Sequence, residues 1–376
     1  MGRHRWTVLA GTAVLLVGGF LLARNVSIGD KYPGSPMLWP SSEYNQDTEA
    51  IGRKFNNTDV INVIVEGDGW NAIKYPEVLG KMYGLQREMA SLPEVGGTSS
   101  IADYIPPLIR AMHGGDPRWE LVPTEAREAG FFLEMIYGAS EPGDLSRFIT
   151  PDSRHANIAI YLKDHKGETL RKVVETLRNY VDQNPMEHAK FRLAGGYGGL
   201  LASVNEVVMS TEALVTGLAF LSVFLLCAIF YRSVLAGIFF MLPLVLSNYL
   251  TYALMGLRGI GLDVNALPVV SLGVGLGVDY GMYVASRVME EYKIRKDLQA
   301  SIVIAMSTSG KAVLLTAATM VAGVVFWTFS FLRFQADMGL LLVFWMTMSM
   351  VGSLLLLPTL IWMFKPRFVI GSAKRG

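Results

Sequence analysis

This sequence of 376 residues has few of the groups that bind metals, nucleic acids or cofactors. Its single cysteine, Cys227, lies in an apolar run, so no disulfide can form within the chain. The histidines are scattered and show no metal-ligand spacing, so we expect no metal and no cofactor. Only 17% of the residues are charged, the formal net charge is +1, and no basic stripe with interleaved aromatic residues supports nucleic acid as a partner.

Motifs of two enzyme classes are incomplete. Intramembrane aspartyl proteases use Gly-x-Gly-Asp and a second buried aspartate, but here Val278 separates the second glycine from Asp279, and we expect no second acid at that depth. The pair Gly310-Lys311 lacks the flanking residues of a phosphate-binding loop, so ATP hydrolysis is not supported. We therefore expect that the chain is not an enzyme.

Apolar residues, in contrast, are abundant. They make up 51% of the sequence, and the mean hydropathy is +0.36, which is typical of a polytopic membrane protein. Six apolar runs are each about long enough to span a bilayer as a helix: 6–22, 213–231, 234–257, 267–288, 312–331 and 339–364. We predict an N-terminal transmembrane helix in residues 1–24, a domain in 25–209, and five transmembrane helices in 210–376. A cleaved signal peptide is the alternative for the first run, but residues 21–24 form a poor cleavage site.

The region 25–209 has the composition of a globular domain. Patterns of alternating apolar residues predict strands at 59–66, 155–162 and 190–193, and helical patterns lie at 75–91 and 167–182. This order of strands and helices predicts an α+β domain of the split βαβ, ferredoxin-like kind. The segment 104–142, rich in proline, glycine and aromatic residues, interrupts the pattern and is expected to be a helical insertion or a flexible loop.

The distribution of Lys and Arg predicts the orientation in the membrane. Basic residues gather on the side that holds both termini, and the short loops on the other side carry only Arg258 and Arg333. By the positive-inside rule, both termini are cytoplasmic and the domain 25–209 lies outside. Segment 289–309 is expected to be a helix along the cytoplasmic membrane surface or a solvated connector.

One stretch, residues 265–287, combines an acid with a ladder of small residues. Asp279 lies near the middle of this apolar run, where a carboxylate costs roughly 2.5–3.5 kcal/mol and usually marks an ion or substrate pathway. Gly273, Gly277 and Gly281 fall on one side of the helix and allow another helix to approach closely. Because Asp279 lies on the opposite side, we expect this helix to be buried on both sides.

Asp279 has no Lys or Arg at its depth in the predicted helices, and burial without a cation favours the protonated carboxyl. We therefore expect Asp279 to bind and release a proton. Candidate partners are hydroxyl-bearing residues near its depth: Tyr280, Tyr283, Ser271, Thr316 and Thr319. The alternative is a neutral aspartate that only joins helices, although asparagine or serine would do this at lower cost.

Layout and motifs together resemble one half of a resistance-nodulation-division (RND) permease, most of all an MMPL-type exporter of lipids and other hydrophobic compounds. The resemblance rests on the arrangement of one helix, a domain and five helices, and on three motifs: GVGLGVDYGMYVASRVMEEY (273–292), GKAVLLTAATMVAG (310–323) and LAGGYGGLLASVNE (193–206). It implies that Asp279 and Tyr280 carry protons, that the domain 25–209 is a periplasmic porter domain, and that the proton-motive force drives transport across a bacterial inner membrane.

Full-length relatives contain two such halves, whereas this chain contains one. The resemblance therefore implies a second half as partner, either another copy of this chain or a separate RND chain, unless the sequence is part of a longer one. Membrane lipids and a periplasmic protein are further expected partners. Two other functions remain open: a proton-coupled accessory unit of a protein translocase, and a sterol-sensing-like membrane domain without transport.

Overall fold

The computed structural model describes residues 5–32, 34–55, 59–193 and 195–371, so several basic residues of the predicted charge bias at the two termini lie outside the described residues. Two compact units are present. The bundle unit comprises Met1–Lys31, Ser35–Trp39 and Asn205–Gly376, and the sheet unit comprises Tyr32–Gly34 and Pro40–Val204. Each unit is described below by itself.

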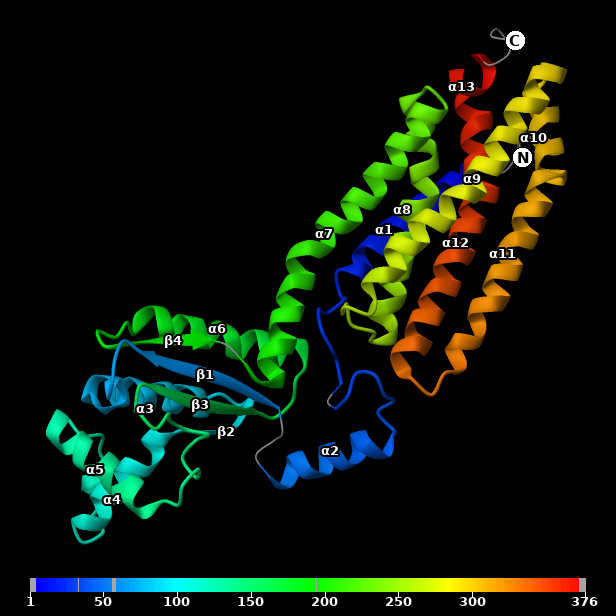
Figure 1. The fold of residues 1–376 in the computed structure, drawn as a ribbon. Helices are drawn as coiled ribbons and strands as arrows, with labels where there is room; N and C mark the ends of the chain where they lie inside the picture. Colours follow the sequence, from blue (N-terminus) through cyan, green and yellow to red (C-terminus); the bar gives the residue numbers. More distant parts are fainter. Residues whose placement is uncertain (1–4, 33, 56–58, 194, 372–376) are drawn as a thin grey trace. The chain divides into compact units, whose positions relative to one another are not determined.

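The sheet unit is built on a four-stranded antiparallel sheet in the order β2-β3-β1-β4 (Figure 1). Its strands are β1 (Val60–Gly67), β2 (Val95–Ser99), β3 (His155–Leu162) and β4 (Ala189–Leu193). Helix α3 (Pro76–Ala90) follows β1, and α6 (Gly167–Gln183) follows β3. This connectivity and strand order form the split βαβ, ferredoxin-like arrangement. The predicted fold class, a polytopic helical membrane protein with a small α+β domain, is confirmed.

The core of the sheet unit follows from the alternation along β1. Every second residue is buried, among them Ile61, Val63 and Val65, and these pack in one cluster with the apolar faces of α3 and α6. Asp164 fixes the start of α6, because its carboxylate accepts hydrogen bonds from the Lys166 amide and the Thr169 hydroxyl. Burial raises the pKa of Asp164, but the hydrogen bonds from Lys166 and Thr169 outweigh burial and hold this pKa below its usual value.

The segment between β2 and β3 is a helical insertion. It contains η2 (Ile101–Tyr104), α4 (Ile105–Met112), η3 (Pro117–Trp119) and α5 (Ala126–Ala139). Ile105 and Phe132 are buried in the same core as the sheet, whereas Trp119 and Phe131 are exposed. The insertion therefore shares its core with the sheet. The short helices α2 (Glu43–Lys54) and η1 (Ala72–Lys74) complete the described elements of this unit.

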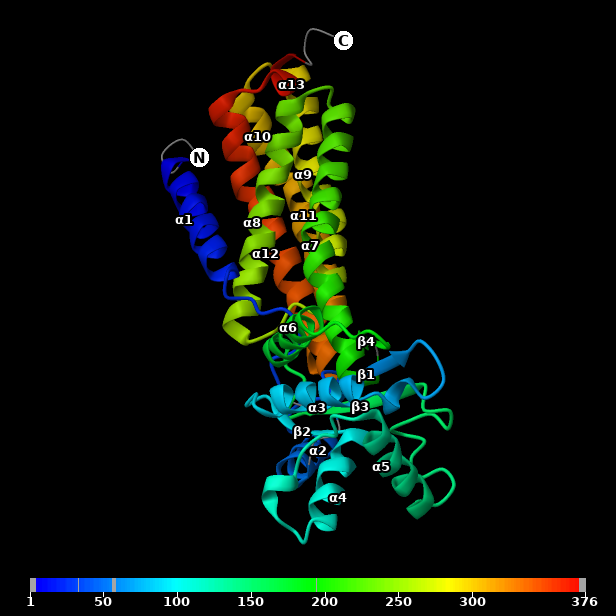
Figure 2. The same ribbon diagram turned by 90° about the vertical axis from the view of Figure 1, so that its left-hand side faces the viewer.

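Six helical segments of the described chain are long and apolar enough to cross a membrane (Figure 2). They are α1 (Arg5–Ala23), α7 (Gly196–Phe230), α8 (Val234–Arg258), α9 (Leu267–Arg295), the segment Leu298–Phe329 and α12 (Arg333–Phe364). Segment Leu298–Phe329 consists of α10 (Leu298–Ser307), α11 (Ser309–Val325) and η4 (Phe326–Phe329), and a short α13 (Arg367–Ile370) follows α12. We call the end of the bundle at which α8 begins and α9 and α12 end the terminal end, and the opposite end the loop end.

Helix α12 packs against α8 and α9 through very close contacts. Trp345 of α12 is fully buried, and a Cβ added at Gly273 or Gly277 of α9 would lie 2.5 Å from its ring. At Gly281 the same atom would lie 3.0 Å from the ring of Phe240 in α8. The glycine side of α9 is therefore filled by large aromatic side chains of its neighbours.

The segment 289–309 differs from the prediction of a helix along the membrane surface. Helix α9 continues to Arg295, and α10 packs against α9 and forms one candidate span with α11. The reason is the apolar second half of this segment, in which Ile302 and Ala305 are buried in the bundle core. A solvated connector is excluded for the same reason.

We predict that Gly277→Ala lowers the thermal unfolding temperature of the detergent-solubilised chain. The added Cβ would meet the Ser349 hydroxyl at 2.4 Å and the Trp345 ring at 2.5 Å, so α9 and α12 must separate. Overpacking of this kind costs about 1–3 kcal/mol. The matched control is Gly323→Ala in α11, where no atom lies within 4 Å of the new Cβ and alanine favours the helix by up to about 1 kcal/mol. Equal effects of the two substitutions would contradict the packing described here.

Candidate functional site

Asp279 lies near the middle of α9, and its side chain is exposed. Within the part of the chain that the structure describes, no hydrogen-bond donor and no ion-pair partner contacts its carboxyl group. Helix α9 is a candidate membrane span, so this carboxyl lies at a depth where a charge is costly. The described part of one chain leaves that cost uncompensated.

The exposed carboxyl belongs to a whole face of α9. Ser271, Leu272, Gly275 and Tyr283 lie within about 80° of Asp279 around the helix axis, at 100° per residue, and all are exposed. The expectation that α9 is buried on both sides is therefore wrong for this face within one chain. The glycine face is covered by α8 and α12, and the side that carries Tyr280 is covered by α11. We call this the open face of α9.

Tyr280 points away from Asp279. It is 2% exposed and packs with Val313 and Ala317 of α11, and its hydroxyl lies 3.9 Å from the sulfur of Met320. The structure thus places the two neighbouring residues on different sides of α9. Tyr280 reaches α11, whereas Asp279 faces outward.

The other predicted hydroxyl partners divide into two groups. Ser271 and Tyr283 lie on the open face with Asp279. Thr316 and Thr319 are exposed on α11, where the Thr319 hydroxyl donates to the Thr316 carbonyl oxygen at 2.8 Å. The described residues contain no contact between these two threonines and Asp279, so only the first group shares its surroundings.

A second acid on a candidate span was missed by the sequence analysis. Glu212 lies in α7, where the Tyr252 hydroxyl of α8 donates to its Oε1 at 2.5 Å and the Thr216 hydroxyl donates to the same atom at 3.2 Å. The apolar run in the sequence begins only after Glu212, so hydropathy places this residue outside the span. Tyr252 lies in the last turns of α8, so this contact joins α7 and α8 towards the loop end.

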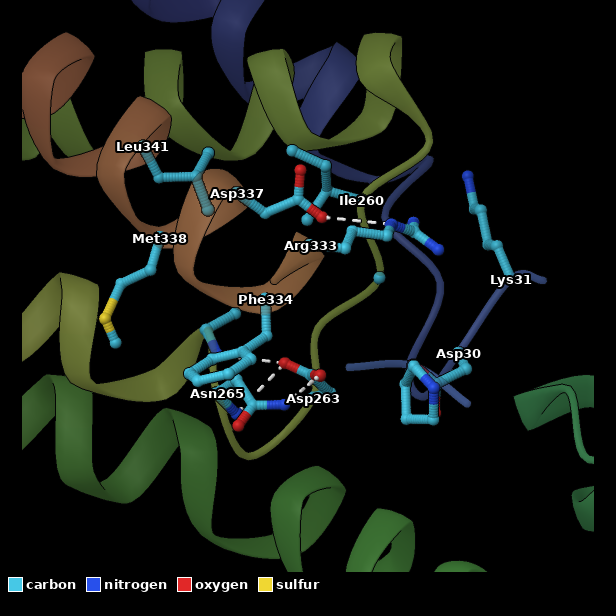
Figure 3. Close-up of a pocket in the computed structure, with 13 residues that line it drawn as sticks. Asp30, Lys31, Ile260, Asp263, Asn265, Arg333, Phe334, Asp337, Met338 and Leu341 are labelled. Atoms are coloured by element: carbon cyan, nitrogen blue, oxygen red, sulfur yellow. Dashed lines mark hydrogen bonds and ion pairs between the residues drawn. The ribbon is translucent and has the colours of Figure 1, made fainter. Parts of the chain in front are cut away.

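Asp337, which precedes the predicted apolar run 339–364, lies on a helix and not in a loop. Helix α12 begins at Arg333, and the Arg333 guanidinium pairs with the Asp337 carboxylate at 3.3 Å. The pair lines a small pocket at the loop end, with about 30 Å³ of room for water-sized groups (Figure 3). The other labelled residues that line the pocket come from the segment after α1, the loop between α8 and α9, and the first turns of α12. They are Asp30, Lys31, Ile260, Asp263, Asn265, Phe334, Met338 and Leu341.

Two acids of this pocket, Asp263 and Asp337, are engaged by the chain itself. Asp263 accepts hydrogen bonds from the backbone amides of Asn265 and Ala266 at 3.0 and 2.9 Å and from the Asn265 side chain at 2.8 Å, which fixes the turn before α9. Asp337 is neutralised by Arg333. We therefore interpret the pocket as the place where three segments are joined, and Asp279 as the candidate functional site.

Comparison with known proteins agrees with this layout. A model of the MMPL family matches residues 37–375. The chain belongs to the MMPL family. MJ1562, a predicted membrane protein of Methanocaldococcus jannaschii, is 24% identical over 330 residues, which cover 86% of this chain and 81% of that protein. YdgH, a predicted membrane protein of Bacillus subtilis, is 24% identical over 216 residues, which cover 54% of this chain but only 24% of that protein. The predicted RND-type, MMPL resemblance is thereby confirmed.

We predict that Tyr252→Phe destabilises this MMPL protein by about 1–3 kcal/mol, because the Glu212 carboxylate loses a short hydrogen bond from a neighbouring helix. The measurement is thermal unfolding in detergent. Tyr249→Phe, one turn earlier in α8, is the control, because the described residues offer its hydroxyl no hydrogen-bond partner and its ring contact with Phe20 is retained. If Tyr252→Phe is no less stable than Tyr249→Phe, the contact does not join α7 to α8.

Proposed function

We propose that this MMPL protein is an exporter of lipids or other hydrophobic compounds, driven by the proton-motive force. The observation that carries the proposal is the position of Asp279: a carboxyl in the middle of a candidate membrane span, without a cationic partner among the described residues. Ionisable residues at such positions usually belong to ion pathways. Membership of the MMPL family supports the transporter class.

The energetic cycle follows from the cost of charge in the membrane. A neutral Asp279 is tolerated beside apolar helices, whereas the carboxylate requires water or a donor, at roughly 2.5–3.5 kcal/mol. A proton that crosses the membrane releases about 2.3 kcal/mol per 100 mV. Binding and release of one proton at Asp279 can therefore shift the helix bundle between two arrangements of comparable free energy. The protein makes and breaks no covalent bond of its cargo in this cycle.

The proposed orientation places both termini in the cytoplasm and the sheet unit in the periplasm of a bacterial inner membrane. Arg287 and the basic residues at the end of α9 lie at the terminal end, in agreement with the positive-inside rule. The helical insertion of the sheet unit exposes Trp119 and Phe131, which suit contact with an amphiphile. Cargo would be taken from the outer leaflet or from the periplasm.

We further propose that a second copy of the chain covers the open face of α9. A carboxyl that faced lipid would have no donor, and Gly275 at the centre of this face leaves room for a neighbouring helix, since no atom lies within 4 Å of its added Cβ. Two copies related by a twofold axis would bring both Asp279 residues to one interface. A separate RND-type chain in that place is an outcome that the mass of the complex distinguishes.

Asp279→Asn is expected to abolish proton-driven export while the protein inserts and folds normally. The amide keeps the size and hydrogen-bonding capacity of the side chain but cannot release a proton. The measurement is movement of a fluorescent phospholipid in proteoliposomes under an imposed pH gradient. Glu175→Gln, an exposed acid on α6, is the control and should retain the wild-type rate. Wild-type export by the Asp279→Asn protein would exclude the proton-carrying role.

Cysteine cross-linking tests the proposed second copy. The Cys227→Ser background removes the native thiol, which is buried. In this background, Leu272→Cys on the open face should form a disulfide-linked dimer in membranes, because the proposed interface brings two open faces together. Val14→Cys, which is 70% exposed on α1, is the control and should remain monomeric. Equal cross-linking at both positions would indicate random collision. If the wild-type protein in nanodiscs has the mass of a single chain, the homodimer is excluded.

A further inference from the structure

A polar contact between α7 and α9 lies towards the terminal end of the bundle. The hydroxyl of Tyr231, directly after α7, lies 2.8 Å from the Ser286 hydroxyl of α9 and also donates to the Met282 carbonyl oxygen at 3.3 Å. Tyr231 is 8% exposed, although it belongs to the turn that connects two candidate spans. The hydroxyl of a buried tyrosine requires a hydrogen-bond partner, and here α9 provides it.

Ser286 lies on the same side of α9 as Asp279. Seven residues separate them, which is two helical turns, so their directions differ by about 20° and their heights by about 10.5 Å. Tyr283 lies between them on the open face and is 62% exposed. Hydroxyl groups thus follow Asp279 along one face towards the terminal end, and the last of them contacts Tyr231.

We propose that Ser286 and Tyr231 form the terminal-end part of the proton path from Asp279, by way of Tyr283. This inference rests on the proposed function. At each hydroxyl, the oxygen takes a proton from the preceding donor and gives its own proton to the next acceptor, so only O–H bonds form and break and no net charge stays on the path. A turn of each hydroxyl about its C–O bond resets the chain for the next proton.

The surroundings of Tyr231 hold it in place for this role. Its ring contacts Phe230, Phe240 and Phe368, with centroid separations of 5.0, 5.0 and 5.9 Å. Charged and titratable groups close to it in the chain, or on the elements that pack against it, include Cys227, Arg232, Arg287, Glu290, Glu291 and Arg367. Arg287 pairs with Glu290 at 3.1 Å and with Glu291 at 2.7 Å, so these three charges beyond Ser286 are paired with one another. The proton path would end beside these paired charges.

The contact could also serve only to hold the tight turn between α7 and α8 in place. Tyr231 lies in this turn directly before Arg232, whose φ is +49°. The test must separate the two roles. Tyr231→Phe retains the aromatic packing and loses only the hydroxyl, and Ser286→Ala removes the second hydroxyl with a small change of volume. Tyr292→Phe is the matched control, a phenol on the same helix that points away from the open face.

The experiment measures proton uptake and movement of fluorescent phosphatidylethanolamine in phosphatidylethanolamine–phosphatidylglycerol vesicles under an imposed pH gradient. We expect Tyr231→Phe and Ser286→Ala to lower both rates by about a hundredfold in protein that inserts and folds at the wild-type level, and Tyr292→Phe to match the wild type. If either variant retains wild-type rates while Asp279→Asn is inactive, the path is wrong and the proposed function stands. If the wild type moves neither protons nor lipid, both proposals fail. If Tyr231→Phe does not fold, Ser286→Ala alone decides.

Discussion

The fit of Trp345 against two glycines of α9 determines the orientation of this helix, which carries the candidate site. The indole is fully buried, and no residue with a side chain could occupy Gly273 or Gly277 without moving it. In a bilayer there is no hydrophobic driving force between helices, so such close van der Waals contact is what holds α9 to α12. Because the glycines must face Trp345, the rotation of α9 about its axis is fixed, and Asp279 must point to the opposite side. One packing constraint thus places the acid.

This constraint also explains why a single chain leaves the candidate site open. The helices that pack most closely on α9 all lie away from Asp279, and the open face carries a glycine, small polar groups and Tyr283. A face of this composition suits neither lipid nor bulk water in the middle of a membrane. The most stable environment for it is another protein surface with limited water, in which a carboxyl can be neutral in one state and hydrated in another. Under the proposed function, burial of this face and proton transfer at Asp279 would use the same second surface.

The sequence predicted much of this architecture, and the elements that it did not predict were missed for physical reasons. Strands β1 and β3 were recognised by their apolar alternation, whereas β2 escaped because Val95–Ser99 contains two glycines and pairs only with β3 at the edge of the sheet. Hydropathy located the apolar part of each span but not the helical residues that precede it, so neither Asp337 nor Glu212 falls within a predicted apolar run. Asp279 was found because an acid in an apolar run is conspicuous. The contact of Tyr231 with Ser286 could not be found, because it depends on how α7 lies beside α9.

Hydrogen bonds attach α7 to its neighbours at two points, whereas close van der Waals packing holds α8, α9 and α12 together. Towards the loop end α7 is joined to α8 through Glu212 and Tyr252, and at the terminal end it is joined to α9 through Tyr231 and Ser286. Hydrogen bonds between membrane helices contribute about 0.6–2 kcal/mol each. One proton moved across 100 mV supplies about 2.3 kcal/mol, which is comparable to either bond but small against the loss of a buried tryptophan, at about 3–5 kcal/mol. If the proton performs work in this bundle, α7 is therefore the helix whose attachments it can rearrange, while α8, α9 and α12 remain packed as one body.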